Sequence, residues 1–223
     1  MTRTDVQPHD EIRARLAVPP IIAILRAGSA RRLPEVCEVL YAAGIRALEF
    51  TFTTPGALEA LQRTRDRLPP DAVLGTGSVR TPEHVDASVD AGADFLVSPV
   101  TVPELLQRAR EREVPYLPGA VTPSEIHTAW AAGAAAVKIS PCGPIGGPAY
   151  VRAVRAPMPD IPLMPTGGIG IDEVGAYLAA GALAVGLGGS FQGDAADPGG
   201  DLDTLAERAH RALRSAGHSA GPS

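Results

Sequence analysis

The stretch "AAGIRALEF" (42–50) reads as the end of a helix followed by an apolar strand, and the same pattern recurs along the chain. The later copies are "DAGADFLVSP" (90–99), "AGAAAVKISP" (132–141) and "AAGALAVGLGG" (179–189). In each copy an Ala-Gly pair stands where the helix ends, and glycine is favoured there because it readily adopts a left-handed backbone conformation. Each copy therefore predicts a transition from a helix to a buried strand.

Between these copies the sequence contains further apolar runs, at 20–25, 72–78, 114–119 and 161–168. Amphipathic segments separate the runs, and the last such segment covers 201–216. Eight unbroken apolar strands alternating with eight helices predict an α/β fold, a (β/α)8 TIM barrel whose strands are covered on both faces. A doubly wound open sheet is the alternative, although such a sheet rarely needs eight regular repeats.

The chain length of 223 residues fits a single barrel domain, which we expect over 19–216. In the preceding segment, 1–18, the stretch "HDEIRARLA" predicts a short N-terminal helix that covers the bottom of the barrel. Residues 217–223 are small or polar and are predicted to form a disordered tail.

The composition narrows the class of protein. The formal net charge is -5, whereas proteins that bind nucleic acids usually carry a basic face. The chain begins without an apolar signal region and has no apolar run long enough to span a membrane, so we expect a cytoplasmic protein with no membrane partner. Cys37, Cys142 and the five scattered histidines form no metal-spaced cluster, so we expect no metal site. We expect the histidines to be solvated or packing residues rather than ligands.

Lys138 is the only lysine in the chain, and every other permanently cationic side chain is an arginine. A salt bridge or a phosphate contact would accept arginine, which stays protonated in proteins. Schiff-base chemistry requires a primary amine that can lose its proton when it is desolvated. Because Lys138 ends the sixth predicted strand, we predict that it is a catalytic nucleophile, the alternative being a lysine retained by chance.

Glu49 occupies a similar position, between apolar neighbours in "ALEFTF" on the second predicted strand. The alternative to a catalytic role for Glu49 is a purely structural one, in a buried ion pair with Lys138. Such pairs contribute little net stability, so a lysine and a glutamate together in a barrel mouth favour catalysis. A carboxylate beside a reactive amine supplies the general acid and base that imine formation and carbon–carbon cleavage require.

Two glycine-rich loops follow the last two predicted strands. They are "TGGI", which holds Gly167 and Gly168, and "LGGS", which holds Gly189 and Ser190. The loops after strands seven and eight often bind phosphate in this fold, through backbone N–H groups and a hydroxyl. Paired glycines can also be ordinary turns, but their presence at both loops favours a phosphate site.

The combined motifs resemble those of the 2-keto-3-deoxy-6-phosphogluconate (KDPG) aldolase / 4-hydroxy-2-oxoglutarate (KHG) aldolase family. The resemblance runs from about Pro20 to Phe191. The matching stretches, in order, are "IIAILR", "LEFTFTTPGA", "LGTGSV", "LVSP", "PYLPG", "VKISP", "PTGGI" and "GLGGS". Their order and spacing together are specific, whereas any one of them alone is weak.

The resemblance implies a class I aldolase that carries a covalent imine on Lys138 and uses neither a metal nor another cofactor. It implies that Glu49 is the acid/base carboxylate and that Ser78 contacts the carboxylate of a small keto-acid substrate. Pro99, which ends "LVSP", is placed with Ser78 among the substrate-binding residues. Family members are typically homotrimers, so the resemblance implies a homotrimer here.

The chain also departs from the family pattern. Some members carry an arginine four residues after the catalytic glutamate. Here that position is Thr53, which we expect on the second predicted strand and among the substrate-binding residues. We predict that Arg26, which leaves the neighbouring first strand, supplies the missing anion contact, the alternative being a salt bridge at the rim. Some members have aromatic residues after the lysine, where this chain has Ile139 and Ser140.

The predicted activity is cleavage of KDPG or its galactonate epimer to pyruvate and glyceraldehyde 3-phosphate, with KHG as a further candidate substrate. Two other functions are weighed against it. A phosphosugar isomerase or synthase on a similar barrel would need acid/base carboxylates but no lone lysine. A non-catalytic ligand-binding barrel would bind phosphate esters without turnover.

Overall fold

In the computed structural model, which describes residues 8–218, each glycine of the recurring motif lies two residues after the last residue of a helix. Gly44, Gly92, Gly133 and Gly181 have φ angles of 107°, 84°, 92° and 95°. A side chain at these angles would be strained, and glycine is not. The predicted helix-to-strand transitions are therefore present at all four copies.

The element bounds follow the predicted alternation closely. The strands are β1 (Ile21–Leu25), β2 (Ala47–Thr51), β3 (Val73–Gly77), β4 (Phe95–Val97), β5 (Tyr116–Leu117), β6 (Gly119–Ala120), β7 (Val137–Ile139), β8 (Leu163–Pro165) and β9 (Val185–Leu187). The helices are α1 (Pro8–Leu16), α2 (Leu33–Ala42), α3 (Ala57–Arg65), α4 (Pro82–Asp90), α5 (Pro103–Glu111), α6 (Pro123–Ala131), α7 (Gly147–Arg155), the 3-10 turn η1 (Ile171–Glu173), α8 (Val174–Ala179), α9 (Gly189–Gln192) and α10 (Leu202–Ser215).

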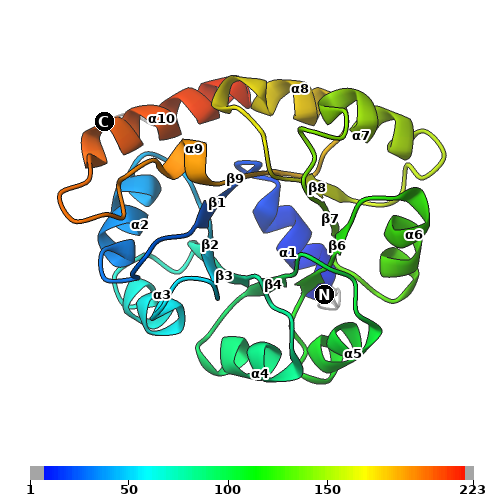
Figure 1. The fold of residues 1–223 in the computed structure, drawn as a ribbon, viewed down its shortest axis with the longest axis horizontal. Coiled ribbons are helices and arrows are strands. Elements are labelled where there is room, and N and C mark those ends of the chain that lie inside the picture. The colour runs from blue at the N-terminus through cyan, green and yellow to red at the C-terminus, as the bar shows by residue number, and fades with distance from the viewer. Residues whose placement is uncertain (1–7, 219–223) are drawn as a thin grey trace, which may run out of the picture.

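All the strands pair in parallel, within two sheets. One sheet has the order β5-β4-β3-β2-β1-β9 and the other has the order β6-β7-β8. An isolated parallel bridge between Thr166 and Gly186 links the end of β8 to β9. Figure 1 shows the strands at the centre with helices arranged around them, so the chain has an α/β fold built on parallel strands.

The strand predicted at 114–119 is divided in two. Pro118 separates β5 from β6, and proline has no N–H group to donate to a neighbouring strand. The break places the two halves of this segment in different sheets. The sequence pattern showed the apolar run correctly but missed this interruption.

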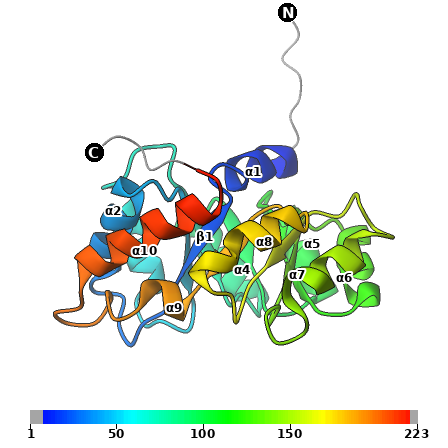
Figure 2. The same cartoon turned by 90° about the horizontal axis from the view of Figure 1, so that it is seen from above.

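The core has an outer and an inner part. The larger cluster lies between the strands and the surrounding helices. The smaller cluster joins Ile12 and Leu16 of α1 to inward-facing strand residues such as Ile22, Ala47 and Val73. The predicted N-terminal helix is therefore present as α1, and it packs against the amino ends of the strands (Figure 2).

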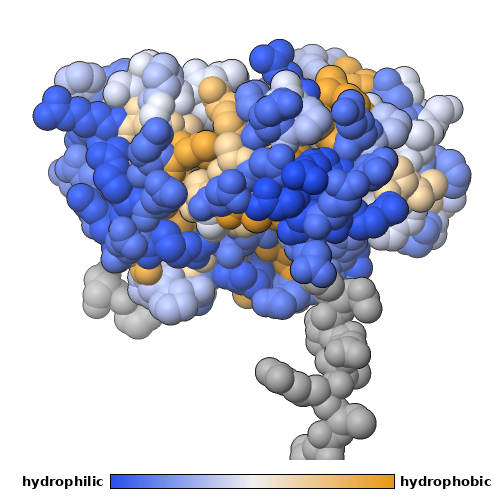
Figure 3. Space-filling model, turned by 90° about the horizontal axis from the view of Figure 1, so that it is seen from below, coloured by the Kyte–Doolittle hydropathy of each residue, from blue (hydrophilic) through white to orange (hydrophobic). Residues whose placement is uncertain are grey.

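The helix surfaces are largely polar. The face seen in Figure 3 is mainly hydrophilic with smaller hydrophobic areas between, and ion pairs such as Arg108–Asp86 and Arg112–Asp90 join α5 to α4. Within residues 8–218, no helix combines the length and the apolar character needed to cross a membrane. Most of the predicted tail, 219–223, lies outside the described residues.

Candidate active site

Lys138 lies at the centre of β7, with only 8% of its surface exposed. Its strand partners are Gly119 on β6 and Met164 on β8. Its side chain reaches a cavity of about 410 Å³ at the carboxyl ends of the strands. The lining residues are Ile24, Arg26, Lys138, Ser140, Thr166, Gly167, Gly168, Ile169, Gly186, Gly188, Gly189 and Ser190. The cavity thus brings the lone lysine together with Arg26 and all four predicted phosphate-loop residues.

Glu49 lies in the middle of β2 and is 1% exposed. Gly77 on β3 makes room for its carboxyl group, because a Cβ atom at Gly77 would lie 1.8 Å from Glu49 Oε1. Glu49 Oε2 is buried and has no hydrogen-bond partner within the described chain. Gly77 was not among the predicted site residues, and the only signal for it was a glycine inside an apolar strand.

The charge state of Glu49 is set by two opposing effects. Burial raises the pKa of Glu49 above the ordinary value for a carboxyl group, and the positive charges of Lys138 and Arg26 oppose that rise. Among the ion pairs of residues 8–218, none joins Glu49 to Lys138. Glu49 is therefore not held in a closed ion pair, and it keeps a proton more readily than an exposed carboxyl group.

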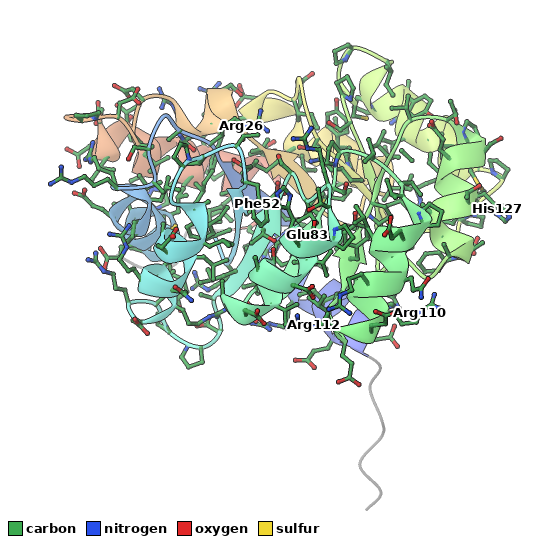
Figure 4. The ribbon with its side chains drawn as sticks, turned by 60° about the horizontal axis from the view of Figure 1, so that its bottom comes forward. Arg26, Phe52, Glu83, Arg110, Arg112 and His127 are labelled. Carbon is green, nitrogen blue, oxygen red and sulfur yellow. The ribbon has the colours of Figure 1, made fainter. Side chains whose placement is uncertain are left out.

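Arg26 follows the end of β1 and has an exposed side chain that lines the cavity (Figure 4). Its backbone is fixed by Gln192 of α9. Arg26 N–H donates to Gln192 Oε1 at 3.0 Å, and Gln192 Nε2 donates to the Arg26 carbonyl at 2.9 Å. Within the described chain its guanidinium makes no ion pair and no hydrogen bond. Among the residues that the structure describes, the alternative of a rim salt bridge therefore has no partner for Arg26.

Thr53 was predicted to lie on the second strand, and this placement is wrong. The strand β2 ends at Thr51, and Thr53 lies in the following turn with an exposed side chain. Its hydroxyl donates to Thr51 Oγ1 at 3.1 Å, and Thr53 does not line the cavity around Lys138. The chain turns away after Thr51 because Thr54 N–H bonds back to the Thr51 carbonyl.

Ser78 and Pro99 lie just after β3 and β4, outside the set of residues that line the cavity. Ser78 is half-buried and has φ of 62°, a left-handed conformation that is uncommon for residues other than glycine. Such strained residues cluster at functional sites. Pro99 is exposed, and its carbonyl oxygen would lie 2.4 Å from a Cβ atom on Gly119. The structure therefore places both near the strand ends and, like Glu49, outside the lining of the Lys138 cavity.

The two glycine loops approach the cavity from β8 and β9. Gly167 and Gly168 have φ of 82° and 71°, which glycine adopts without strain. Gly189 and Ser190 begin the short helix α9, which the sequence did not predict. The role of Gln192 in this helix was also missed, because its partner Arg26 is distant in sequence.

The histidines were expected to be packing or surface residues rather than ligands. His84 of α4 stacks on Phe52 with the ring centroids 4.1 Å apart, which agrees with a packing role. In the part of the chain that the structure describes, no cluster of three or more His, Cys, Asp or Glu side chains is placed to hold a metal ion.

Comparison with known proteins gives consistent results. The family model described as KDPG and KHG aldolase matches residues 12–206. A 2-dehydro-3-deoxy-phosphogluconate aldolase of Pseudomonas aeruginosa is 38% identical over 170 residues, 76% of each chain. A probable 2-dehydro-3-deoxy-6-phosphogalactonate aldolase of Rhizobium meliloti is 31% identical over 173 residues, 77% of this chain and 81% of the relative.

A solved KDPG aldolase from Legionella pneumophila holds pyruvate captured at low pH as a covalent carbinolamine intermediate. Its TM-score is 0.80 at 30% identity, and the match covers 92% of this chain and 98% of that one. The family match, over residues 12–206, includes the strands that carry Lys138 and Glu49 and both glycine loops. The chain belongs to the KDPG and KHG aldolase family, whose members are carbon–carbon lyases.

Proposed function

We propose that this aldolase cleaves KDPG or its galactonate epimer to pyruvate and glyceraldehyde 3-phosphate, and also cleaves KHG to pyruvate and glyoxylate. The observation that carries the proposal is the cavity in which the buried Lys138 meets Arg26 and Ser190. The amine of Lys138 can react with the ketone of a keto acid. The cation of Arg26 and the glycine loop with Ser190 can bind a second anionic group on the same substrate. The names of the relatives from P. aeruginosa and R. meliloti support the two sugar acids.

The first step is covalent. Lys138, in its neutral form, attacks the C2 carbonyl carbon of the substrate, and the carbonyl oxygen takes up a proton to give a carbinolamine. A further proton transfer lets water leave, and a protonated imine forms. Glu49, which keeps a proton readily in its buried position, supplies and removes these protons. The carbinolamine held by the Legionella relative supports this sequence.

The second step breaks the carbon–carbon bond. Glu49, now ionised, accepts the proton of the C4 hydroxyl group as the C3–C4 electron pair moves toward the protonated imine. The aldehyde leaves and an enamine remains on Lys138. Protonation at C3 and hydrolysis of the imine then release pyruvate and restore the amine. The imine itself is the electron sink in this scheme, so the scheme assigns no role to a metal or another cofactor.

The remaining contacts hold the two anionic ends of the substrate. We assign Gly167, Gly168, Gly189 and Ser190 to the phosphate, because they line the cavity on the side of β8 and β9. Arg26 contributes to the same cavity a guanidinium that is unpaired within residues 8–218. We assign Ser78, Pro99 and Thr53 to the keto-acid carboxylate and the substrate chain, at the ends of β2, β3 and β4.

We also propose a closed (β/α)8 barrel and a homotrimer in the cytoplasm. The bridge between Thr166 and Gly186 and the short gap at Pro118 are the two junctions that closure requires. A structure matched at 31% identity is a cage made by fusing symmetric oligomeric domains, which supports an oligomer. Light scattering after size-exclusion chromatography should give three times the chain mass of 23.0 kDa.

The activity is tested by measuring pyruvate release from KDPG, its galactonate epimer and KHG. We expect release from at least one phosphorylated substrate and a dependence on Lys138. A phosphosugar isomerase or synthase would release no pyruvate, and a binding protein would bind the phosphate ester without turnover. Release of pyruvate from none of the three substrates would refute the proposal.

A further inference from the structure

Gln192 is 5% exposed and uses both ends of its side-chain amide on one residue. Its Oε1 accepts a hydrogen bond from the Arg26 N–H at 3.0 Å, and its Nε2 donates to the Arg26 carbonyl at 2.9 Å. A side-chain amide presents a donor and an acceptor side by side, as a backbone peptide group does. Gln192 thus pairs with Arg26 in the way that a neighbouring strand would.

The chain needs such a partner at this point because the strand pairing has ended. β9 pairs with β1 only from Ile21 to Ala23, so no strand residue of β9 faces Arg26. On the β2 side, Thr51 Oγ1 donates to the Leu25 carbonyl and Thr54 Oγ1 accepts from the Ala27 N–H, each at 3.0 Å. Side chains therefore fix the backbone on both sides of Arg26.

The backbone of Arg26 is held by hydrogen bonds, whereas its guanidinium is not. It is exposed, lines the cavity of Lys138, and is unpaired within the described chain. Gln192 does not itself line that cavity, but it stands two residues after Ser190, which does. The amide of Gln192 therefore joins the backbone that carries the free cation to the short helix that begins at the glycine loop.

We propose that Gln192 is a positioning residue that holds Arg26 and the loop Gly189–Ser190 together on one anion, the phosphate of the substrate. This inference rests on the proposed function of the same cavity. Loss of the tether leaves the imine chemistry at Lys138 intact and weakens the grip on the phosphate in the ground state and the transition state alike. Such a change raises KM and leaves kcat nearly unchanged.

The test compares Gln192→Leu, which removes both hydrogen bonds at similar size, with the wild-type protein. Two neutral hydrogen bonds predict an increase of about 5- to 30-fold in the KM for KDPG and in the Kd for inorganic phosphate, measured by phosphorus NMR titration. The rate of borohydride trapping of pyruvate should not change. Gln107→Leu is the matched control, because Gln107 bonds only to Glu111 on the surface of α5.

Gln192→Glu separates positioning from a merely structural role. A protonated carboxyl group can both donate and accept, whereas the ionised form has lost the donor for the Arg26 carbonyl. We expect the phosphate affinity of this variant to recover as the pH falls, and that of Gln192→Leu to stay low. Because it keeps the size of the side chain, Gln192→Glu also serves if Gln192→Leu fails to fold.

Two results would overturn the inference. One is an unchanged phosphate Kd in both variants, with only the melting temperature reduced. The other is a wild-type protein that does not bind inorganic phosphate. A wild-type protein that binds phosphate but forms no pyruvate adduct would instead refute the proposed aldolase function, because phosphate titration does not depend on turnover.

Discussion

Cavities lie at both ends of the strands, and the larger one is at the end away from Lys138. That cavity, of about 830 Å³, lies at the amino ends of β1, β2 and β3 between α1 and the end of α10. Its ionisable residues are Glu11, Arg15, Arg46, Asp71 and His218. The cavity of Lys138 has about 410 Å³, roughly half that volume.

The arginines show how the two ends differ. At the larger cavity, Arg46 pairs with Asp71 at 3.2 Å, donates to the Tyr41 carbonyl and stacks on the Tyr41 ring. Arg15 donates to the Ala72 carbonyl and lies 3.8 Å from Asp94. At the smaller cavity, Arg26 has a fixed backbone and an unpaired guanidinium within residues 8–218.

A glutamate near each cavity shows the same difference between a satisfied and an unsatisfied side chain. Glu11 at the larger cavity is exposed, so its carboxyl group stays hydrated. Glu49 near the smaller cavity is buried with one oxygen unbonded in the described chain, and its pKa is raised. Buried polar groups are nearly always satisfied, so an exception needs a reason. Between these two cavities, an unsatisfied ionisable side chain, rather than cavity volume, identifies the reactive end.

The largest expected effect is the loss of turnover in Lys138→Arg. Arginine keeps the charge but cannot form an imine, so pyruvate release from KDPG should fall below detection while the fold is retained. Adding Arg46→Lys to this variant leaves one lysine, beside the larger cavity. The double variant should also be inactive, and recovery of activity in it would break the distinction between the two ends.

Glu49→Gln should lower kcat by about 10²- to 10⁴-fold, since the amide cannot exchange a proton. Glu11→Gln makes the same change at the larger cavity and should leave kcat unaltered. Steady-state kinetics on KDPG measures both. If Glu49→Gln stays within a factor of about two of wild type, another group, such as the hydroxyl of Ser78, moves the proton.

Arg26→Ala should reduce kcat/KM by about 10- to 150-fold, because charge-assisted hydrogen bonds to an anion contribute roughly 1.5–3 kcal/mol. Combining it with Thr53→Arg should restore part of the loss. Arg46→Ala removes an arginine that is already paired, and should leave kcat/KM unchanged. Unchanged kcat/KM in Arg26→Ala, for both KDPG and KHG, would make this arginine structural.

Ser190→Asp should lower kcat/KM for KDPG about tenfold more than it lowers kcat/KM for KHG. A carboxylate at this position repels the phosphate of KDPG, whereas KHG has no phosphate group. The comparison is the ratio of kcat/KM for KDPG to kcat/KM for KHG, in the variant and in the wild type. Equal damage to both substrates would mean that this loop closes the cavity without binding phosphate.

The smallest expected effect is on stability. The folded protein binds the Glu49 proton more tightly than the unfolded chain, and this difference stabilises the fold. The stabilisation is complete below the ordinary carboxyl pKa of about 4.3 and is lost as the pH rises through the raised pKa of Glu49. The melting temperature of wild type relative to Glu49→Gln should therefore fall as the pH rises above the ordinary carboxyl pKa. A constant difference would show that burial does not raise the pKa of Glu49.

Features that depend on local sequence were predictable. The glycines of the recurring motif end helices, and apolar runs form the strands between them. Lys138 and Glu49 stood out because a charged residue inside an apolar strand is rare and needs a purpose. The glycine loops could be placed once the strand order was known, because the ends of parallel strands meet at one edge.

Features that depend on contacts across the fold were not predictable. Thr53 was assigned to the second strand because it stands two residues after Thr51, but the strand β2 ends at Thr51. The space that Gly77 leaves for Glu49 exists only in the register of β2 and β3. The pairing of Gln192 with Arg26 links residues far apart in sequence, and no local pattern records it.

Mass spectrometry after borohydride reduction with pyruvate tests the central claim most directly. Reduction converts the imine to a stable amine, so the modified residue can be located in a peptide digest. We predict one pyruvate adduct per chain, on the peptide that contains Lys138, and none in Lys138→Arg or in its double variant with Arg46→Lys. An unmodified Lys138 in a preparation that releases pyruvate from KDPG would contradict the account.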